Sequence, residues 1–262
     1  MPIPLFHVDA FTERPFAGNP AAVCVLPAWK NDAWLAAIGR EMNLSETAFL
    51  VKSASGFGLR WFTPTVEVDL CGHATLASAH ILWEQGFAIS PEIQFSTKSG
   101  VLKALRRPDG IDLDFPLKPE EPAPAPPGLL EALGVAAKYI GKSQFDYLVE
   151  VESETALRAV TPDFQSLAKT PARGVIVTSK SNDPRFDFVS RFFAPGAGID
   201  EDPVTGSAHC CLADFWRKRL DKAEFRAFQA SARGGVVQVR IQNSRVLLGG
   251  KAVTVAKGEL LL

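Results

Sequence analysis

Two short stretches place polar or ionisable residues directly before a glycine that opens an apolar helical run. They are DLCGHA, which starts at Asp69, and DPVTGSA, which starts at Asp202. A helix N-terminus presents unpaired backbone N–H groups and the positive end of the helix dipole, and glycine lets a ligand approach closely. One such stretch would be read as a tight turn. Two at matching positions predict anion binding at Gly72 and at Gly206-Ser207.

Glu46 is the leading candidate for proton transfer. It lies in NLSETAFL, between an expected helix and an expected strand. Most glutamates in such loops are simply solvated. Here the apolar run AFLV follows almost at once, so we expect the carboxyl at the mouth of a buried strand. Burial there favours the protonated form, which suits a general acid/base.

Three further residues have both a chemical and a structural interpretation. His73 starts a helix, where the positive dipole end favours a neutral imidazole that could polarise a group or relay a proton; the alternative is a packed or capping histidine. Asp202 could serve the site or simply cap its helix. Cys71 is most simply a small buried apolar residue.

Other chemistries find little support in the sequence. It contains no G-x-G-x-x-G, no Walker loop, and no cysteine or histidine spacing typical of zinc, so no metal site is expected. Asp202, Ser207 and His209 are the residue types of a hydrolase triad. They crowd into one short stretch without a G-x-S-x-G elbow, which disfavours serine hydrolysis.

The two halves of the chain resemble each other. LRWFTP, from Leu59, is echoed by SRFFAP, from Ser190, and the helix-opening glycines follow each at a similar distance. Self-similarity at half the chain length predicts two copies of one domain. A proline-rich segment lies between the copies. We therefore expect an N-terminal lobe over residues 1–117, a linker over 118–127 and a C-terminal lobe over 128–262, with the last strand able to pack back on the first lobe.

Hydrophobic patterning predicts an α+β fold. Helices are expected at 32–42, 72–85, 128–133, 163–168 and 206–220, and strands at 21–26, 47–51, 58–62, 66–70, 174–178, 186–193, 236–241 and 252–255. The helices at 72–85 and 206–220 are apolar over much of their circumference. We expect each to be wrapped by the sheet of its own domain.

The composition and charge of the chain limit the classes of partner that it is expected to bind. The 262 residues carry a formal charge of −1 without a basic cluster, which argues against nucleic acid and anionic membranes. No segment has the features of a signal peptide or the roughly 20 apolar residues of a membrane helix. Four cysteines do not make a disulfide framework, so a cytoplasmic location is expected.

Four motifs together resemble the PhzF family of phenazine-biosynthesis-like isomerases. They are DAFTERPFAGNPAAV (9–23), NLSETAF (43–49), RWFTPTVEVDLCGHATLASAH (60–80) and EDPVTGSAH (201–209). The resemblance implies a diaminopimelate-epimerase-like fold: two pseudo-symmetric α+β domains, each a curled mixed or antiparallel sheet around a central helix, with the site in the cleft between them. It also implies a homodimer.

The resemblance assigns roles to individual residues. It implies catalysis by Glu46, His73 and Asp202, and substrate binding by Asn19, Ser45, Gly72, Gly206 and Ser207. The implied reaction needs no cofactor and no metal. A proton is removed from a ring carbon of a small carboxylic acid and returned elsewhere on the same molecule, as in isomerisation of a dihydro-hydroxyanthranilate.

Two alternatives stay open. Epimerases and proline racemases of this fold use two cysteines as opposed bases. Here Cys71 occupies the first place and Thr205 the second, which disfavours two-base racemisation because a hydroxyl is a far weaker acid than a thiol. One-base racemisation using Cys71 remains, as does a non-catalytic ligand- or protein-binding member of the fold.

Overall fold

The computed structural model describes residues 2–261 and divides into two compact units. The first comprises Met1–Phe115 and Gly249–Leu262, and the second comprises Pro116–Leu248. The proline-rich segment expected as a linker thus lies in the second unit. There the short strand β9 (Glu121–Pro122) pairs with β10 (Tyr139–Lys142).

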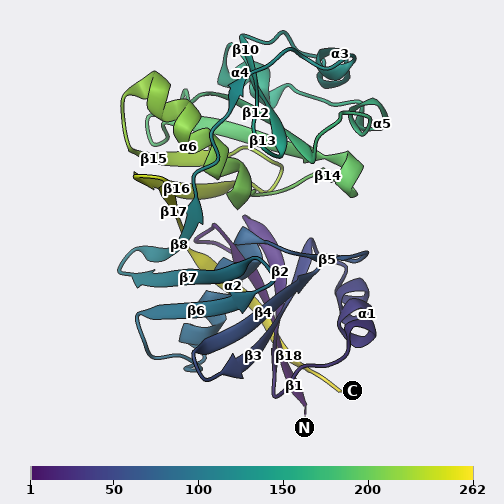
Figure 1. Cartoon of the computed structure of the whole chain (residues 1–262), viewed down its shortest axis with the longest axis vertical. Coiled ribbons are helices and arrows are strands. Elements are labelled where there is room, and N and C mark those ends of the chain that lie inside the picture. The colour runs from purple at the N-terminus through teal and green to yellow at the C-terminus, as the bar shows by residue number, and fades with distance from the viewer. Residues whose placement is uncertain (1, 262) are drawn as a thin grey trace. The chain divides into compact units, whose positions relative to one another are not determined.

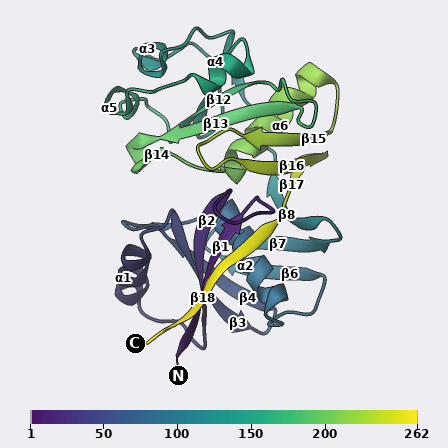
Figure 2. The ribbon, with the colours of Figure 1, turned by 180° about the vertical axis from the view of Figure 1, so that it is seen from behind.

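The first unit is a curled mixed sheet with two helices (Figure 1). Its elements are β1 (Ile3–Ala10), β2 (Asn19–Leu26), α1 (Asp32–Met42), β3 (Glu46–Ser53), β4 (Gly56–Phe62), β5 (Glu67–Val68), α2 (Gly72–Glu84), β6 (Glu92–Thr97), β7 (Gly100–Arg107), β8 (Gly110–Pro116) and β18 (Ala252–Leu260). Strand β1 pairs antiparallel with β2 and β18, β2 pairs parallel with β3, β3 antiparallel with β4, and β4 parallel with β6. The C-terminal strand β18 therefore lies beside the first strand of the chain (Figure 2).

Helix α2 is the centre of the first unit. Its sequence GHATLASAHILWE is small or apolar on nearly every side, and most of its residues are buried. A helix that is apolar all round must be enclosed. It packs against β1, β2, β3, β7 and β18, and its alanines let the strands approach closely. The curled sheet thereby fixes the direction in which the N-terminus of α2 points within this unit.

The second unit repeats this plan. Its other elements are α3 (Leu129–Leu133), β11 (Asp146–Glu150), α4 (Glu154–Arg158), α5 (Phe164–Leu167), β12 (Gly174–Lys180), β13 (Phe188–Ala194), the 3-10 helix Pro195–Ala197, β14 (Ile199–Glu201), α6 (Gly206–Leu220), β15 (Glu224–Gln229), β16 (Gly235–Gln242) and β17 (Arg245–Gly250). Strands β11 and β12 are parallel, β12 and β13 antiparallel, and β13 and β15 parallel, with α6 between the last two in sequence. This pairing order matches β2, β3, β4 and β6 around α2.

The repeat extends to individual side chains. On β4, the Arg60 guanidinium binds the Glu67 carboxylate with Nε 2.7 Å from Oε1. On β13, Arg191 binds Glu201 at the same 2.7 Å distance. Both pairs join a long strand to the short strand that follows it. The internal duplication predicted from LRWFTP and SRFFAP is confirmed.

Within residues 2–261, no helix combines the length and apolar character needed to span a membrane.

Candidate active site

Glu46 is the first residue of β3. Helix α1 ends at Met42 and is capped by Asn43, whose left-handed backbone (φ 48°) turns the chain and whose N–H donates to Gly39 O at 3.2 Å. Strand β3 then inserts parallel to β2, with Ala21 opposite Glu46. This placement leaves the Glu46 residue only 9% exposed.

Cys71 and His73 lie at the N-terminus of α2. Cys71 is the N-cap residue in extended conformation (φ −145°), and its side chain makes no capping hydrogen bond. Its carbonyl accepts hydrogen bonds from the backbone and hydroxyl of Thr75, at 3.2 and 2.5 Å. His73 follows in the first turn and is 4% exposed. The start of α2 therefore lacks a side-chain cap and can bind an anion.

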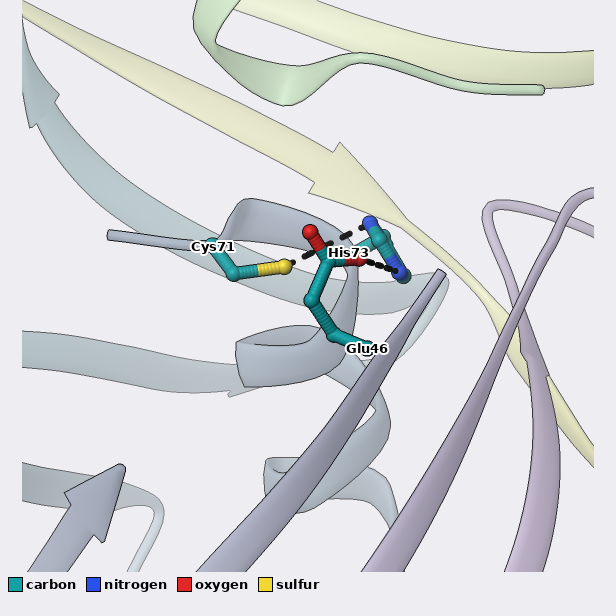
Figure 3. Close-up of side chains that lie close together, drawn as sticks. All are labelled: Glu46, Cys71 and His73. Atoms are coloured by element: carbon teal, nitrogen blue, oxygen red, sulfur yellow. Dashed lines mark hydrogen bonds and ion pairs between the residues drawn. The ribbon is translucent and has the colours of Figure 1, made fainter. Parts of the chain in front are cut away.

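The imidazole of His73 contacts both a thiol and a carboxylate (Figure 3). Its Nδ1 is 3.5 Å from Cys71 Sγ, and its Nε2 is 3.1 Å from Glu46 Oε2. The second contact has an ion-pair distance but not the direction of a hydrogen bond, so within residues 2–261 Nε2 and Oε2 are buried without a hydrogen-bond partner. Buried polar atoms of this kind are uncommon and can be satisfied by a ligand.

The buried environment shifts the protonation of both partners of Glu46. Burial, and then the Glu46 carboxylate, raise the pKa of Cys71 to about 11, so its thiol is protonated near neutral pH. Burial alone would lower the pKa of His73, but its neighbours Cys71 and Glu46 together outweigh burial and raise it well above 6.5. The raised pKa favours an imidazolium, whereas the helix dipole had led us to expect a neutral imidazole. The full negative charge of a carboxylate at contact distance outweighs the partial positive charge of a helix end.

The other first-unit candidates lie at the same end of the sheet. Ser45 directly precedes Glu46 and is partly buried, and Gly72 opens α2 between Cys71 and His73. Asn19 is the first residue of β2 and is 0% exposed. Because β2 and β3 run parallel with Ala21 opposite Glu46, Asn19 and Glu46 both lie at the N-terminal ends of their strands.

The second-unit candidates surround the N-terminus of α6. Thr205, not Asp202, is the N-cap residue, and its hydroxyl donates to Asp202 Oδ2 at 2.5 Å. The side chain of Gln229 bridges Asp202 and Thr205. Its Oε1 accepts a hydrogen bond from the Thr205 backbone N–H at 2.8 Å, and its Nε2 donates to Asp202 O at 2.7 Å. Gly206 and Ser207 then open the helix. The structure thus orients Asp202 through Thr205 and Gln229 and does not use it as a direct cap.

Sequence reasoning missed Gln229, because a glutamine at a strand end carries no local signal of its partners. The contacts of His209 likewise decide between a catalytic and a structural interpretation of this residue. Its Nδ1 donates to Thr205 O at 2.8 Å, its ring stacks on Phe188, and burial lowers its pKa to about 4. Nδ1 is bound to the Thr205 carbonyl and Nε2 has no hydrogen-bond partner among the described residues, so His209 does not make the hydrogen bond to Ser207 that a hydrolase triad requires.

The structure brings Glu46, Cys71 and His73 together, and it places Asp202, Gly206 and Ser207 around α6. The expectation that both groups serve one cleft stays a prediction, as do the individual roles. The contact of Cys71 with His73 was not expected. Its signal was the spacing Cys-Gly-His at a helix start, which places both side chains near the first turn.

Comparison with known proteins identifies the family. Residues 8–258 match the family described as phenazine biosynthesis-like protein, so the chain belongs to the PhzF family and the resemblance is confirmed. An uncharacterized isomerase from Halalkalibacterium halodurans is 53% identical over the full length of both chains. The crystal structure of an Enterococcus faecalis PhzF family protein, 42% identical, superposes with a TM-score of 0.96 and full coverage of both chains.

A more distant likeness concerns the fold alone. A probable proline racemase from Agrobacterium radiobacter K84 is 12% identical, with a TM-score of 0.66 over 99% of this chain and 93% of that one. The expected epimerase-like fold of two similar α+β domains is thereby confirmed.

Proposed function

We propose that the protein is a cofactor-independent isomerase that shifts a proton on a small cyclic or unsaturated carboxylic acid, with Glu46 as general acid/base. Its family contains proteins named isomerases, and epimerases and racemases share the fold, which supports an isomerase- or epimerase-type enzyme acting on a small molecule. The finer statement depends on the geometry of the first unit.

One observation carries the proposal: a buried carboxylate lies 3.1 Å from a buried imidazole at the uncapped start of a central helix. The backbone N–H groups at the start of α2 can hold the carboxylate of the substrate. Glu46 Oε2 lacks a hydrogen-bond donor and is therefore available to accept a proton. The paired His73 supplies positive charge where negative charge would develop.

The proposed reaction has two proton transfers. The Glu46 carboxylate takes a proton from an activated carbon, and the electrons of that C–H bond move into the conjugated system of the acid. The helix N-terminus and the His73 imidazolium stabilise this anion. The carboxylic acid of Glu46 then returns the proton to a second carbon, which restores both the enzyme and the charge balance.

The alternatives account for less of the site. One-base racemisation through Cys71 needs a thiolate, yet burial raises the pKa of this thiol to about 11. A non-catalytic binding protein has no need of a carboxylate with a free buried oxygen. The roles proposed for Asp202, Gly206 and Ser207 in substrate binding rest on the family motif.

Deuterium exchange tests the proposal. The wild-type protein in D₂O should place deuterium on carbon of a dihydro-hydroxyanthranilate or a related cyclic dihydro acid, as read by NMR. Glu46→Gln keeps the size of the side chain but removes the base, and should reduce exchange by more than about 100-fold. Glu92→Gln, a change on strand β6, is the matched control and should exchange at the wild-type rate.

Exchange by Glu46→Gln at the wild-type rate would contradict the assignment of the base. Tight binding of the acid by the wild type without exchange would favour the non-catalytic alternative. Exchange confined to the α-proton of free amino acids would favour racemisation.

A further inference from the structure

The Glu46, Cys71 and His73 side chains bring a carboxylate, a thiol and an imidazole into one small volume. Their ligand atoms all lie within 4.8 Å of one another, and all three residues are at most 9% exposed. Sulfur, nitrogen and oxygen donors together are the ligands that zinc prefers. From this donor set we propose that the three residues form an inhibitory binding site for Zn²⁺, an inference that goes beyond the proposed isomerase activity.

The spacing of the thiol and the imidazole fits zinc. In a tetrahedral site, a Zn–S bond of about 2.3 Å and a Zn–N bond of about 2.0–2.1 Å hold sulfur and nitrogen about 3.5 Å apart. The distance from Cys71 Sγ to His73 Nδ1 is 3.5 Å. The separation of these two ligand atoms is thus already that of a zinc site.

The carboxylate supplies the third ligand. Glu46 Oε2 has no hydrogen bond to hold it, so rotation about its own side-chain bonds can bring it to the metal. Two anionic ligands, a thiolate and a carboxylate, balance the charge of the ion and outweigh the positive helix end nearby. Three protein ligands leave the fourth position to water, as in open zinc sites.

Binding exchanges protons for metal without any redox change. The Cys71 S–H bond and one N–H bond of the His73 imidazolium break, both protons pass to solvent, and Zn–S and Zn–N bonds form in their place. A thiol that coordinates zinc loses its proton outright, so the protonated state of metal-free Cys71 does not prevent binding. Once coordinated, the Glu46 oxygen can no longer accept a proton from carbon, so the ion should inhibit the proposed reaction.

Cobalt(II) is the probe, because its tetrahedral thiolate complexes absorb in the visible and near ultraviolet. Titration of the full-length wild-type protein with Co²⁺ should give a thiolate-to-metal charge-transfer band that Zn²⁺ displaces. Cys71→Ser should abolish the band and weaken Zn²⁺ binding, measured by calorimetry, by more than about tenfold. His73→Gln, an independent ligand change, should weaken it similarly, with folding verified by circular dichroism.

Cys24→Ala is the matched control. Cys24 is also a buried free thiol of the first unit, on strand β2, but it is not part of the cluster, and its variant should keep the band. The proposal is overturned if wild-type protein shows no charge-transfer band, or if Cys71→Ser retains it. Metal binding is measured without substrate, so either result leaves the proposed isomerase activity to its own test.

Discussion

At the scale of single residues, the protonation of the histidines follows from what each ring contacts. His73 contacts a carboxylate and has a raised pKa, whereas His209 contacts a backbone carbonyl and the ring of Phe188 and has a pKa lowered to about 4. Both rings are buried, so burial alone does not decide the outcome. A charged partner does, and the sequence could not show which histidine would have one.

His209 should make folding sensitive to acid. Its pKa is about 4 in the folded protein and near the ordinary 6.5 in the unfolded chain, so protonation favours unfolding. Its contribution is complete above about pH 6.5 and is lost as pH falls, by about 2 kcal/mol near pH 5. Urea unfolding from about pH 7.5 to pH 5 should show this loss in the wild type.

The matched variant is His209→Asn, because its amide nitrogen can replace Nδ1 on the Thr205 carbonyl but does not titrate. Its free energy of unfolding should fall less steeply over the same pH range. Parallel pH profiles for the two proteins would show that His209 is not the titrating group.

Among the secondary-structure elements, the strength of the local sequence pattern determined which helices and strands could be predicted. Helices α1 and α6 match the expected ranges 32–42 and 206–220, because each has a long apolar face and a clear end. Helix α4 was not predicted, although α3 and α5, which are no longer than α4, were expected at 128–133 and 163–168. Strand β7, GVLKALRR, escaped because several of its residues are exposed and charged. Its position comes from pairing with β6 and β8, which no local pattern encodes.

For the candidate site too, the features with a local sequence signal could be predicted and the others could not. The positions of Glu46, His73 and the two helix starts at element boundaries could be predicted because they belong to short motifs, while their roles stay predictions. The contacts of Cys71 with His73 and of Gln229 with Asp202 depend on side-chain direction and on strands distant in sequence.

The link between α6 and its sheet offers a stability test. Trp216 Nε1 donates to Thr178 Oγ1 at 3.0 Å, and that hydroxyl donates to Val189 O at 2.7 Å, all in buried surroundings. Thr178→Val keeps the shape but leaves the indole N–H unsatisfied, which should lower the free energy of unfolding by about 1–3 kcal/mol.

Thr178→Ser is the control, because it keeps the hydroxyl and loses only a methyl group. Chemical denaturation should find the valine variant the less stable of the two. The reverse order would mean that packing of the methyl group matters more than the hydrogen bonds.

At the scale of the whole molecule, the chain begins and ends in the same unit. Strand β18 pairs along the length of β1, from Ile3 opposite Leu260 to Ala10 opposite Ala252, and helix α2 packs against both strands. The last strand thus supports the element that carries Cys71 and His73. The second unit has its own core of Leu133, Val149, Val177, Val189 and Phe193 with their neighbours.

Deleting residues 251–262 should therefore act on one unit more than the other. Hydrogen exchange should show lost amide protection in β1 and α2, with protection retained in β12 and α6, because only the first sheet loses a strand. Leu261→Ala, at a residue that is 87% exposed, should leave both units protected. Equal loss in the two units would contradict the assignment of β18 to the first unit.

The central claim is that Glu46 faces a carboxylic acid held by the start of α2. A crystal structure of Glu46→Gln soaked with a dihydro-hydroxyanthranilate tests it most directly, because a variant without the base should retain the unreacted acid. We expect the ligand carboxylate to accept hydrogen bonds from the backbone N–H groups at Gly72 and His73, with an acidic C–H in contact with the side chain of residue 46. Binding of the acid elsewhere, or with its acidic C–H directed away from that side chain, would show that Glu46 is not the base.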